Sequence, residues 1–155
     1  MAEPTKWDEW ETYMWVVAHP DDAEFSSAGT IARLTQAGKR VVIIQVTSGD
    51  KGTPDSTIPS TDLASGREVE EKNAASVLGV NDVVYLRCTD GELIPDLALR
   101  EKVVRQIRTF KPDVVVSHDP YRPYALHPDH RACGFAAIDS VYPTARDPHY
   151  FPAHL

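Results

Sequence analysis

The sequence predicts an α/β fold: a Rossmann-like, doubly wound and mainly parallel sheet flanked by helices, in three layers α/β/α. Two observations lead to this prediction. Short apolar runs rich in β-branched residues alternate four times with longer segments of helical periodicity, the order typical of strand–helix–strand units. The runs are also nearly free of alternating polar residues, as are strands buried on both faces. Right-handed crossovers would then place helices on both sides of the sheet.

The first strand and helix flank a His-Pro-Asp-Asp turn. Residues 14–18 are apolar and form the expected strand, and Pro20 ends it because proline has no amide hydrogen to donate to a sheet. Ser26 or Ser27 then caps a helix that runs to Ala37. The turn therefore lies where a parallel strand ends, which is where α/β sheets bind ligands.

A long loop separates the second strand from its helix. Residues 40–47 contain the strongest signal for a buried strand. Residues 48–62 are rich in Gly, Pro, Ser, Thr and Asp, which predicts a loop long enough to border a substrate. Ser65 opens the next helix with the spacing of a capping box, and Gly79 ends it. The apolar stripe expected to face the core comprises Val69, Ala74, Val77 and Leu78.

Two further strand and helix pairs complete the layout. Residues 82–86 form the third strand, and Asp96 caps a helix that ends at Phe110. Residues 113–117 form the fourth strand. His127 and His130 lie at the start of a last helix, which continues over residues 132–141. We find no internal repeat and no linker between domains.

Composition and charge limit the possible partners. The formal net charge is −7, and the basic residues form no cluster beyond pairs, which argues against nucleic acid and against an anionic membrane. No apolar run approaches the ~20 residues of a membrane span, and we expect no signal peptide. We therefore expect a cytoplasmic protein with free thiols at Cys88 and Cys133. An open sheet edge and a Trp-rich arm over residues 1–13 favour a homo-oligomer.

Histidines and carboxylates follow the ends of the expected strands. In a parallel sheet all strand-to-helix loops lie at one edge, so side chains from several loops can converge there. His-Pro-Asp-Asp follows the first strand and His-Pro-Asp-His follows the fourth, and two such motifs at one edge favour a functional site over isolated structural histidines. The side chains expected there are those of His19, Asp21, Asp22, Asp50, Asp90, His118, His127 and His130.

Two imidazoles and one carboxylate would form a three-ligand zinc site with a fourth position for water. Zinc lowers the pKa of its bound water to about 7 and polarises a carbonyl oxygen, so the protein must supply a base. One of Asp21 and Asp22 would bind the metal while the other accepts a proton. One of His127 and His130 would be a ligand while the other stabilises a developing oxyanion. Spacing alone leaves both choices open.

Five segments closely resemble the LmbE-like, PIG-L-type deacetylases, a family of zinc-dependent N-acetylglucosaminyl deacetylases. The order HPDD, then R-x-x-E with a later LG, then HPDH is highly specific for this family. The resemblance extends over nearly the whole chain from residue 13 onward. The segments are AHPDDAEFSSAGT (18–30), TSGDKGT (47–53), REVEEKNAASVLGV (67–80), DGEL (90–93) and HPDH (127–130).

The resemblance implies a metal site and a catalytic pair. The implied ligands are His19, Asp22 and His130, with Zn²⁺ the usual ion and other divalent metals able to replace it. Asp21 corresponds to the general base, and His127 to the histidine that stabilises the tetrahedral oxyanion.

Further residues have implied or weaker roles. Asp129 corresponds to the carboxylate that orients the catalytic pair, a supporting role that makes physical sense, and Arg67 to an arginine that contacts the polar or anionic part of the substrate. Asp50, Asp90 and His118 are weaker candidates, because capping of a loop explains each of them as well.

The implied reaction is hydrolysis of the N-acetyl group of an N-acetylglucosaminyl-type substrate, a small N-acetyl amino sugar or its conjugate, by attack of a metal-bound water with Asp21 as base. Alternatives are an amide hydrolase acting on a non-sugar N-acyl compound and a metal-binding inactive fragment. A nucleotide-binding module is disfavoured, because no G-x-G-x-x-G follows the first strand. We expect residues 1–155 to form a single LmbE-like deacetylase domain that lacks the usual C-terminal part of the family.

Overall fold

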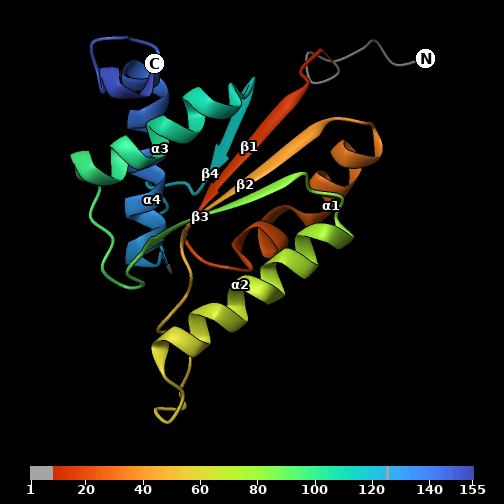
Figure 1. The fold of residues 1–155 in the computed structure, drawn as a ribbon, viewed down its shortest axis with the longest axis vertical. Helices are drawn as coiled ribbons and strands as arrows, with labels where there is room; N and C mark the ends of the chain where they lie inside the picture. Colours follow the sequence, from red (N-terminus) through yellow and green to blue (C-terminus); the bar gives the residue numbers. More distant parts are fainter. Residues whose placement is uncertain (1–8, 125) are drawn as a thin grey trace.

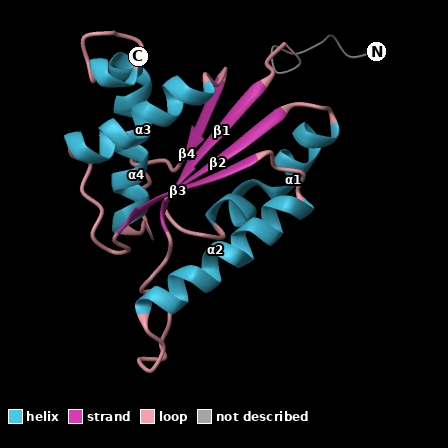
Figure 2. Ribbon diagram, viewed as in Figure 1, coloured by secondary structure: helices cyan, strands magenta, loops and turns pink. Residues whose placement is uncertain are grey.

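A four-stranded parallel sheet forms the centre of the structure, a computed structural model that describes residues 9–124 and 126–155 (Figures 1 and 2). The strand order is β3-β2-β1-β4, so β1 and β2 lie in the middle and β3 and β4 at the edges. All three pairs are parallel, as the sequence predicts. The strands are β1 (Thr12–Val17), β2 (Arg40–Thr47), β3 (Asp82–Cys88) and β4 (Val114–Ser117).

Helices cover both faces of this sheet, which confirms the three-layer α/β/α architecture. On one face, Met14 and Ile44 of the sheet pack with residues of α3 and α4, including Val103 and Ala136. On the other face, Trp15 and its neighbours pack with residues of α1 and with Leu78 at the end of α2. Figure 2 shows these two helix pairs on opposite sides of the strands. The helices are α1 (Asp22–Gln36), α2 (Ser60–Val77), α3 (Leu97–Phe110) and α4 (Pro128–Asp139).

Helix α1 begins earlier than expected, so the prediction that Ser26 or Ser27 caps it is wrong. The helix starts at Asp22, the last residue of the His-Pro-Asp-Asp motif. Ser27 lies at a kink inside the helix, with φ −152°, and its hydroxyl accepts a hydrogen bond from Trp15 Nε1 at 2.8 Å. The serine therefore serves the contact between α1 and β1 and does not begin the helix.

Helix α2 differs most from its prediction. It starts at Ser60, five residues before the expected Ser65, whose hydroxyl instead donates to the carbonyl of Thr61. The predicted apolar stripe is wrong at Val69 and Val77, which are exposed, whereas its member Leu78 packs against the core. The fully buried residues of α2 are Glu71 and Ala75. The helix thus buries a carboxylate at a position that the predicted apolar stripe did not include.

The remaining elements lie close to their predicted bounds. Strand β2 matches exactly, and Asp96 caps α3 by accepting the Leu99 amide at 2.9 Å. Helix α4 starts at Pro128, beside the histidines that were expected at a helix start, and the Nδ1 atom of His127 accepts the Asp129 amide at its N-terminus. The helix continues into a π-helical segment, Ser140–Ala145.

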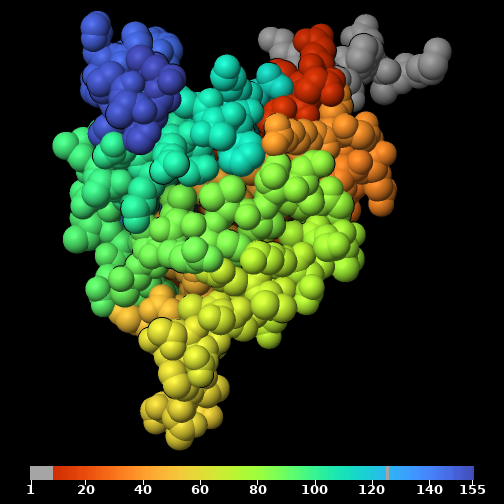
Figure 3. Space-filling model, viewed as in Figure 1, coloured from red at the N-terminus to blue at the C-terminus, as the bar shows by residue number. Residues whose placement is uncertain are grey.

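The loop between β2 and α2 spans residues 48–59 and projects with the first turns of α2 from the body of the molecule (Figure 3). Cys88 and Cys133 are free, as expected. Within the described part of the chain, no helix has the length and apolar character needed to cross a membrane. Most of the Trp-rich arm, including Trp7, lies outside the described residues.

Candidate metal centre

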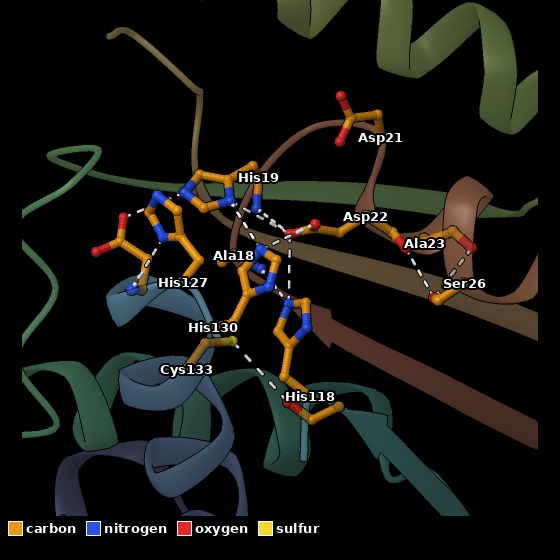
Figure 4. A network of polar contacts seen from close by, with 12 residues as sticks. Ala18, His19, Asp21, Asp22, Ala23, Ser26, His118, His127, His130 and Cys133 are labelled. Atoms are coloured by element: carbon orange, nitrogen blue, oxygen red, sulfur yellow. Dashed lines mark hydrogen bonds and ion pairs between the residues drawn. The ribbon is translucent and has the colours of Figure 1, made fainter. Parts of the chain in front are cut away.

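Imidazoles and carboxylates from several loops meet at the C-terminal edge of the sheet (Figure 4). His19 and Asp22 come from the end of β1, and His118 follows β4. His127 and His130 lie at the start of α4, which brings them to the same place across more than a hundred residues of sequence. The topology thus produces the convergence that the strand order predicts.

Donor atoms of three residues at this edge, one nitrogen each from His19 and His130 and both carboxylate oxygens of Asp22, lie at spacings close to those of a tetrahedral site. His19 Nδ1 lies 3.2 Å from His130 Nε2 and 3.4 Å from Asp22 Oδ2, and His130 Nε2 lies 3.1 Å from Asp22 Oδ1. Ligand bonds of 2.0–2.2 Å in a tetrahedral zinc site place neighbouring donors about 3.3 Å apart. Two imidazoles and a carboxylate are also a ligand set that Zn²⁺ accepts. The residues present therefore fit a divalent metal of this class.

Electrostatics in the cluster favour a charged Asp22. Burial alone would raise the pKa of Asp22, but the imidazoles of His118, His130 and His19 beside its carboxylate outweigh burial and hold this pKa well below its usual range. Asp22 Oδ2 also accepts the His19 amide at 2.7 Å. The carboxylate is thereby fixed and ionised, as a metal ligand must be.

Two buried carboxylates hold the opposite side of the His19 ring. Its Nε2 lies 3.2 Å from Asp129 Oδ2 and 3.1 Å from Asp90 Oδ1. Burial lowers the pKa of His19, but the surrounding carboxylates, Asp22 first, raise it overall. Carboxylates that accept the distal N–H of a histidine fix its tautomer, so here Nδ1 is left free to face Asp22 and His130.

Asp129 is itself rigidly held. It is fully buried, and it accepts main-chain hydrogen bonds from Gly91 at 2.7 Å and Leu93 at 3.2 Å. The sequence assigns it an orienting role toward the catalytic pair. In the structure its carboxylate contacts His19, while only its amide reaches His127.

His127 is placed to donate a hydrogen bond. Because its Nδ1 accepts the Asp129 amide at 3.1 Å, the neutral ring carries its hydrogen on Nε2. Burial and the nearby charge of His19 lower the pKa of His127, which favours this neutral form. Its ring lies 4.7 Å from that of His19, centroid to centroid, so the donor lies beside the candidate metal ligands.

His118 is closer to the cluster than its weak sequence signal suggested. Its ring stacks on His130 at 4.0 Å, and its Nε2 lies 3.3 Å from Asp22 Oδ2. The same nitrogen accepts the Ala18 amide at 3.2 Å. Since this amide engages its lone pair, His118 is a weaker ligand candidate than His130.

Asp21 lies outside the histidine cluster. Figure 4 shows the Asp21 side chain lying apart from the histidines, whereas Asp22 points toward them. Its carboxylate is about half-exposed and bonds Arg67 Nη2 at 3.2 Å, and its amide donates to Glu71 Oε2 at 3.1 Å. Burial raises the pKa of Asp21, and Arg67 opposes this shift. A basic carboxylate beside a metal site suits proton transfer.

Arg67 connects Asp21 to the long loop. Its guanidinium also donates to the carbonyls of Pro20 at 2.9 Å and Gly49 at 3.2 Å. A Cβ added to Gly49 would lie 2.0 Å from Arg67 Nη1, so this close approach requires glycine. Asp50, in the same loop, accepts the Asp90 amide at 3.1 Å. It therefore caps a loop, which was the alternative explanation for this residue in the sequence.

Two buried carboxylates were not recognised as important from the sequence: Glu71 had no predicted role, and Asp90 was only a weak candidate. Glu71 is 2% exposed, and burial raises its pKa. Burial, and then the neighbouring Glu71, raises the pKa of Glu24 to about 7. The signal for Glu71 was its place inside the REVEEKNAASVLGV segment; the signal for Asp90 was its position after a strand.

Comparison with known proteins shows what this chain resembles. The model of the family "PIG-L: GlcNAc-PI de-N-acetylase" matches residues 14–141. Diacetylchitobiose deacetylase of Thermococcus kodakarensis is 41% identical over 79% of this chain and 46% of its own length. A 1D-myo-inositol 2-acetamido-2-deoxy-alpha-D-glucopyranoside deacetylase of Mycobacterium leprae is 30% identical over 83% of this chain and 49% of its own.

A solved structure agrees with the fold. The N,N'-diacetylchitobiose deacetylase of Pyrococcus horikoshii, complexed with its inhibitor MPG, superposes with a TM-score of 0.92 at 33% identity. The match covers 96% of this chain and 55% of that one. The chain thus spans about half the length of the relatives that it matches.

Proposed function

Because the chain belongs to the PIG-L family of de-N-acetylases, we propose that it is a metal-dependent hydrolase that removes the N-acetyl group from an N-acetylglucosaminyl-type substrate. Two relatives named above are deacetylases of N-acetylated amino sugars. The observation that carries the proposal is the set of donor atoms 3.1–3.4 Å apart on His19, Asp22 and His130.

In this proposal, His19 through Nδ1, Asp22 and His130 through Nε2 hold the metal. Zn²⁺ is our first choice, and other divalent ions can replace it. When bound, such an ion activates a water molecule and polarises the acetyl carbonyl. Asp90 and Asp129 lie against Nε2 of His19 and keep the hydrogen of the ring on that nitrogen, so that Nδ1 can bind the metal.

The chain's own groups then handle protons and charge. Asp21 rotates its carboxylate toward the substrate and accepts a proton from the attacking water. The Nε2–H of His127 donates a hydrogen bond to the developing oxyanion. The proton held by Asp21 passes to the departing amine when the C–N bond breaks, so the products are acetate and the free amino sugar. Arg67 holds Asp21 and contacts the polar part of the substrate.

We extend the proposal to the setting of the protein. Residues 1–155 act as one domain on a small N-acetyl amino sugar or conjugate in the cytoplasm, without nucleic acid as a partner. Self-association through the exposed edge of β4 is the proposed oligomeric contact. Sedimentation at several concentrations tests it, and a concentration-independent monomer would contradict it.

The test combines metal analysis with an activity assay. Purified chain is loaded with Zn²⁺, its metal content is measured, and amine release from N,N'-diacetylchitobiose is followed before and after chelation. We expect about one zinc per chain and deacetylation that chelation abolishes. Zinc without turnover on any amino sugar conjugate would favour another N-acyl substrate or an inactive metal-binding fragment. A folded chain that binds no zinc would refute the proposal.

A further inference from the structure

The backbone at Asp21 adopts a conformation that needs support. Its φ is 88°, in the left-handed region that residues with a side chain rarely occupy. Conformations of this kind persist where the surroundings hold them, and they gather at functional sites. The contacts that hold the backbone at Asp21 therefore also determine where the carboxylate of this proposed base lies.

Two residues of α2 hold Asp21 from opposite ends. Arg67 bonds its carboxylate at 3.2 Å, and Glu71 accepts its amide through Oε2 at 3.1 Å. These residues are four apart in α2, so their side chains lie on the same face of the helix, one turn from each other. Arg67 reaches the side chain of Asp21, whereas Glu71 reaches only its backbone.

Burial sets Glu71 apart from an ordinary helix residue. It is 2% exposed, and burying a carboxylate costs free energy that an apolar side chain at the same place would not. Ala75, one turn further along α2, shows how the helix packs where only packing is needed. The carboxylate of Glu71 is buried at this cost, and its Oε2 atom accepts the amide hydrogen of Asp21 in the left-handed turn.

We propose that Glu71 is a positioning residue that holds the left-handed turn of Asp21 by accepting its amide hydrogen, and so presents the Asp21 carboxylate beside Asp22. The effect on rate rests on the proposed function. The contact between the two residues does not depend on it, and it can be measured in the chain without substrate.

A pair of variants of equal length tests the contact. Glu71→Gln keeps an oxygen acceptor for the Asp21 amide, and Glu71→Met removes it. Hydrogen exchange of the Asp21 amide is measured by NMR on the zinc-loaded protein. We expect exchange to be about tenfold faster in Glu71→Met, from the loss of one hydrogen bond, and close to the native rate in Glu71→Gln.

Kinetics on the same samples test the consequence. We expect kcat to fall about tenfold to a hundredfold in Glu71→Met, with KM and zinc content unchanged and rescue by Glu71→Gln. Native exchange of the Asp21 amide in Glu71→Met, or a Glu71→Gln variant as defective as Glu71→Met, would overturn the proposal. If the native chain has no deacetylase activity, the proposed function fails, while the exchange data still decide whether Glu71 holds the turn.

Discussion

Replacement of Asp129 by asparagine tests the support behind the metal centre. Asp129 accepts three hydrogen bonds, from the amides of Gly91 and Leu93 and from Nε2 of His19. An asparagine offers only one oxygen, so in Asp129→Asn its NH₂ group must face at least one of these donors. The variant also removes a buried negative charge beside His19.

The structure sets the expected size of both effects. One buried donor left without an acceptor costs about 1–3 kcal/mol, which corresponds to a loss of roughly 2–4 °C in Tm per kcal/mol for a chain of this size. Removal of a carboxylate that orients a metal-binding histidine weakens metal affinity by about 10–100-fold. The two effects are of similar size, because a 10–100-fold loss of affinity corresponds to about 1.4–2.7 kcal/mol, so stability and zinc affinity must be measured separately.

The assays separate these two effects. Denaturant unfolding of metal-free protein gives the change in stability, and competition with a chromophoric chelator gives zinc affinity. Asp50→Asn is the matched control, because Asp50 also accepts a loop amide but does not contact His19. We expect the control to bind zinc as the native chain does. If Asp129→Asn also binds zinc with native affinity, the inferred support of His19 is wrong.

Three further predictions concern the base, the loop and the start of the sheet. Asp21→Asn should lower kcat by about 10²–10⁴-fold with zinc content unchanged; native turnover would exclude Asp21 as the base. Gly49→Ala should destabilise more than Gly38→Ala in urea unfolding: both have positive φ, which costs about 1–2 kcal/mol, but only Gly49 also meets Arg67. Equal losses would contradict that close approach. Asp113 accepts two amides at the start of β1, which lowers its pKa. The contribution of the Asp113 carboxylate to stability is present above its pKa in the unfolded chain and is lost as pH falls through its pKa in the folded chain. In urea unfolding, Asp113→Ala should therefore be less stable than the native chain at pH 7 and equally stable in strong acid. A constant difference in stability across this pH range would contradict this explanation.

The sequence predicted most accurately those elements whose burial is uniform. Strand β2 is covered on both faces, so its apolar centre predicts a strand with the observed bounds. Asp96 was identified as a cap because its role is local, three residues from the amide that it accepts. Contacts between residues close in sequence, and strands buried along their whole length, can therefore be predicted from the sequence.

Long-range polar contacts leave no such pattern. Val69 and Val77 fitted an apolar stripe on α2, yet the helix buries Glu71, whose reason for burial lies fifty residues earlier in the turn at Asp21. His118 and Asp90 resemble ordinary residues at strand ends. Only the packing of separate loops brings His118 into contact with Asp22 and Asp90 into contact with His19.

The choice between Asp21 and Asp22 shows why local spacing could not assign the base and the ligand. The two aspartates are adjacent and identical, so the HPDD motif treats them alike. The left-handed φ of 88° at Asp21 separates them, because it turns the chain so that Asp22 begins α1 and its carboxylate contacts the histidines. Asp21 is left outside the cluster on Arg67 and Glu71, two side chains of another helix. The proposed division between ligand and base thus depends on how α2 docks against this turn, and variants of α2 should alter the proposed base while they leave the candidate metal ligands in place.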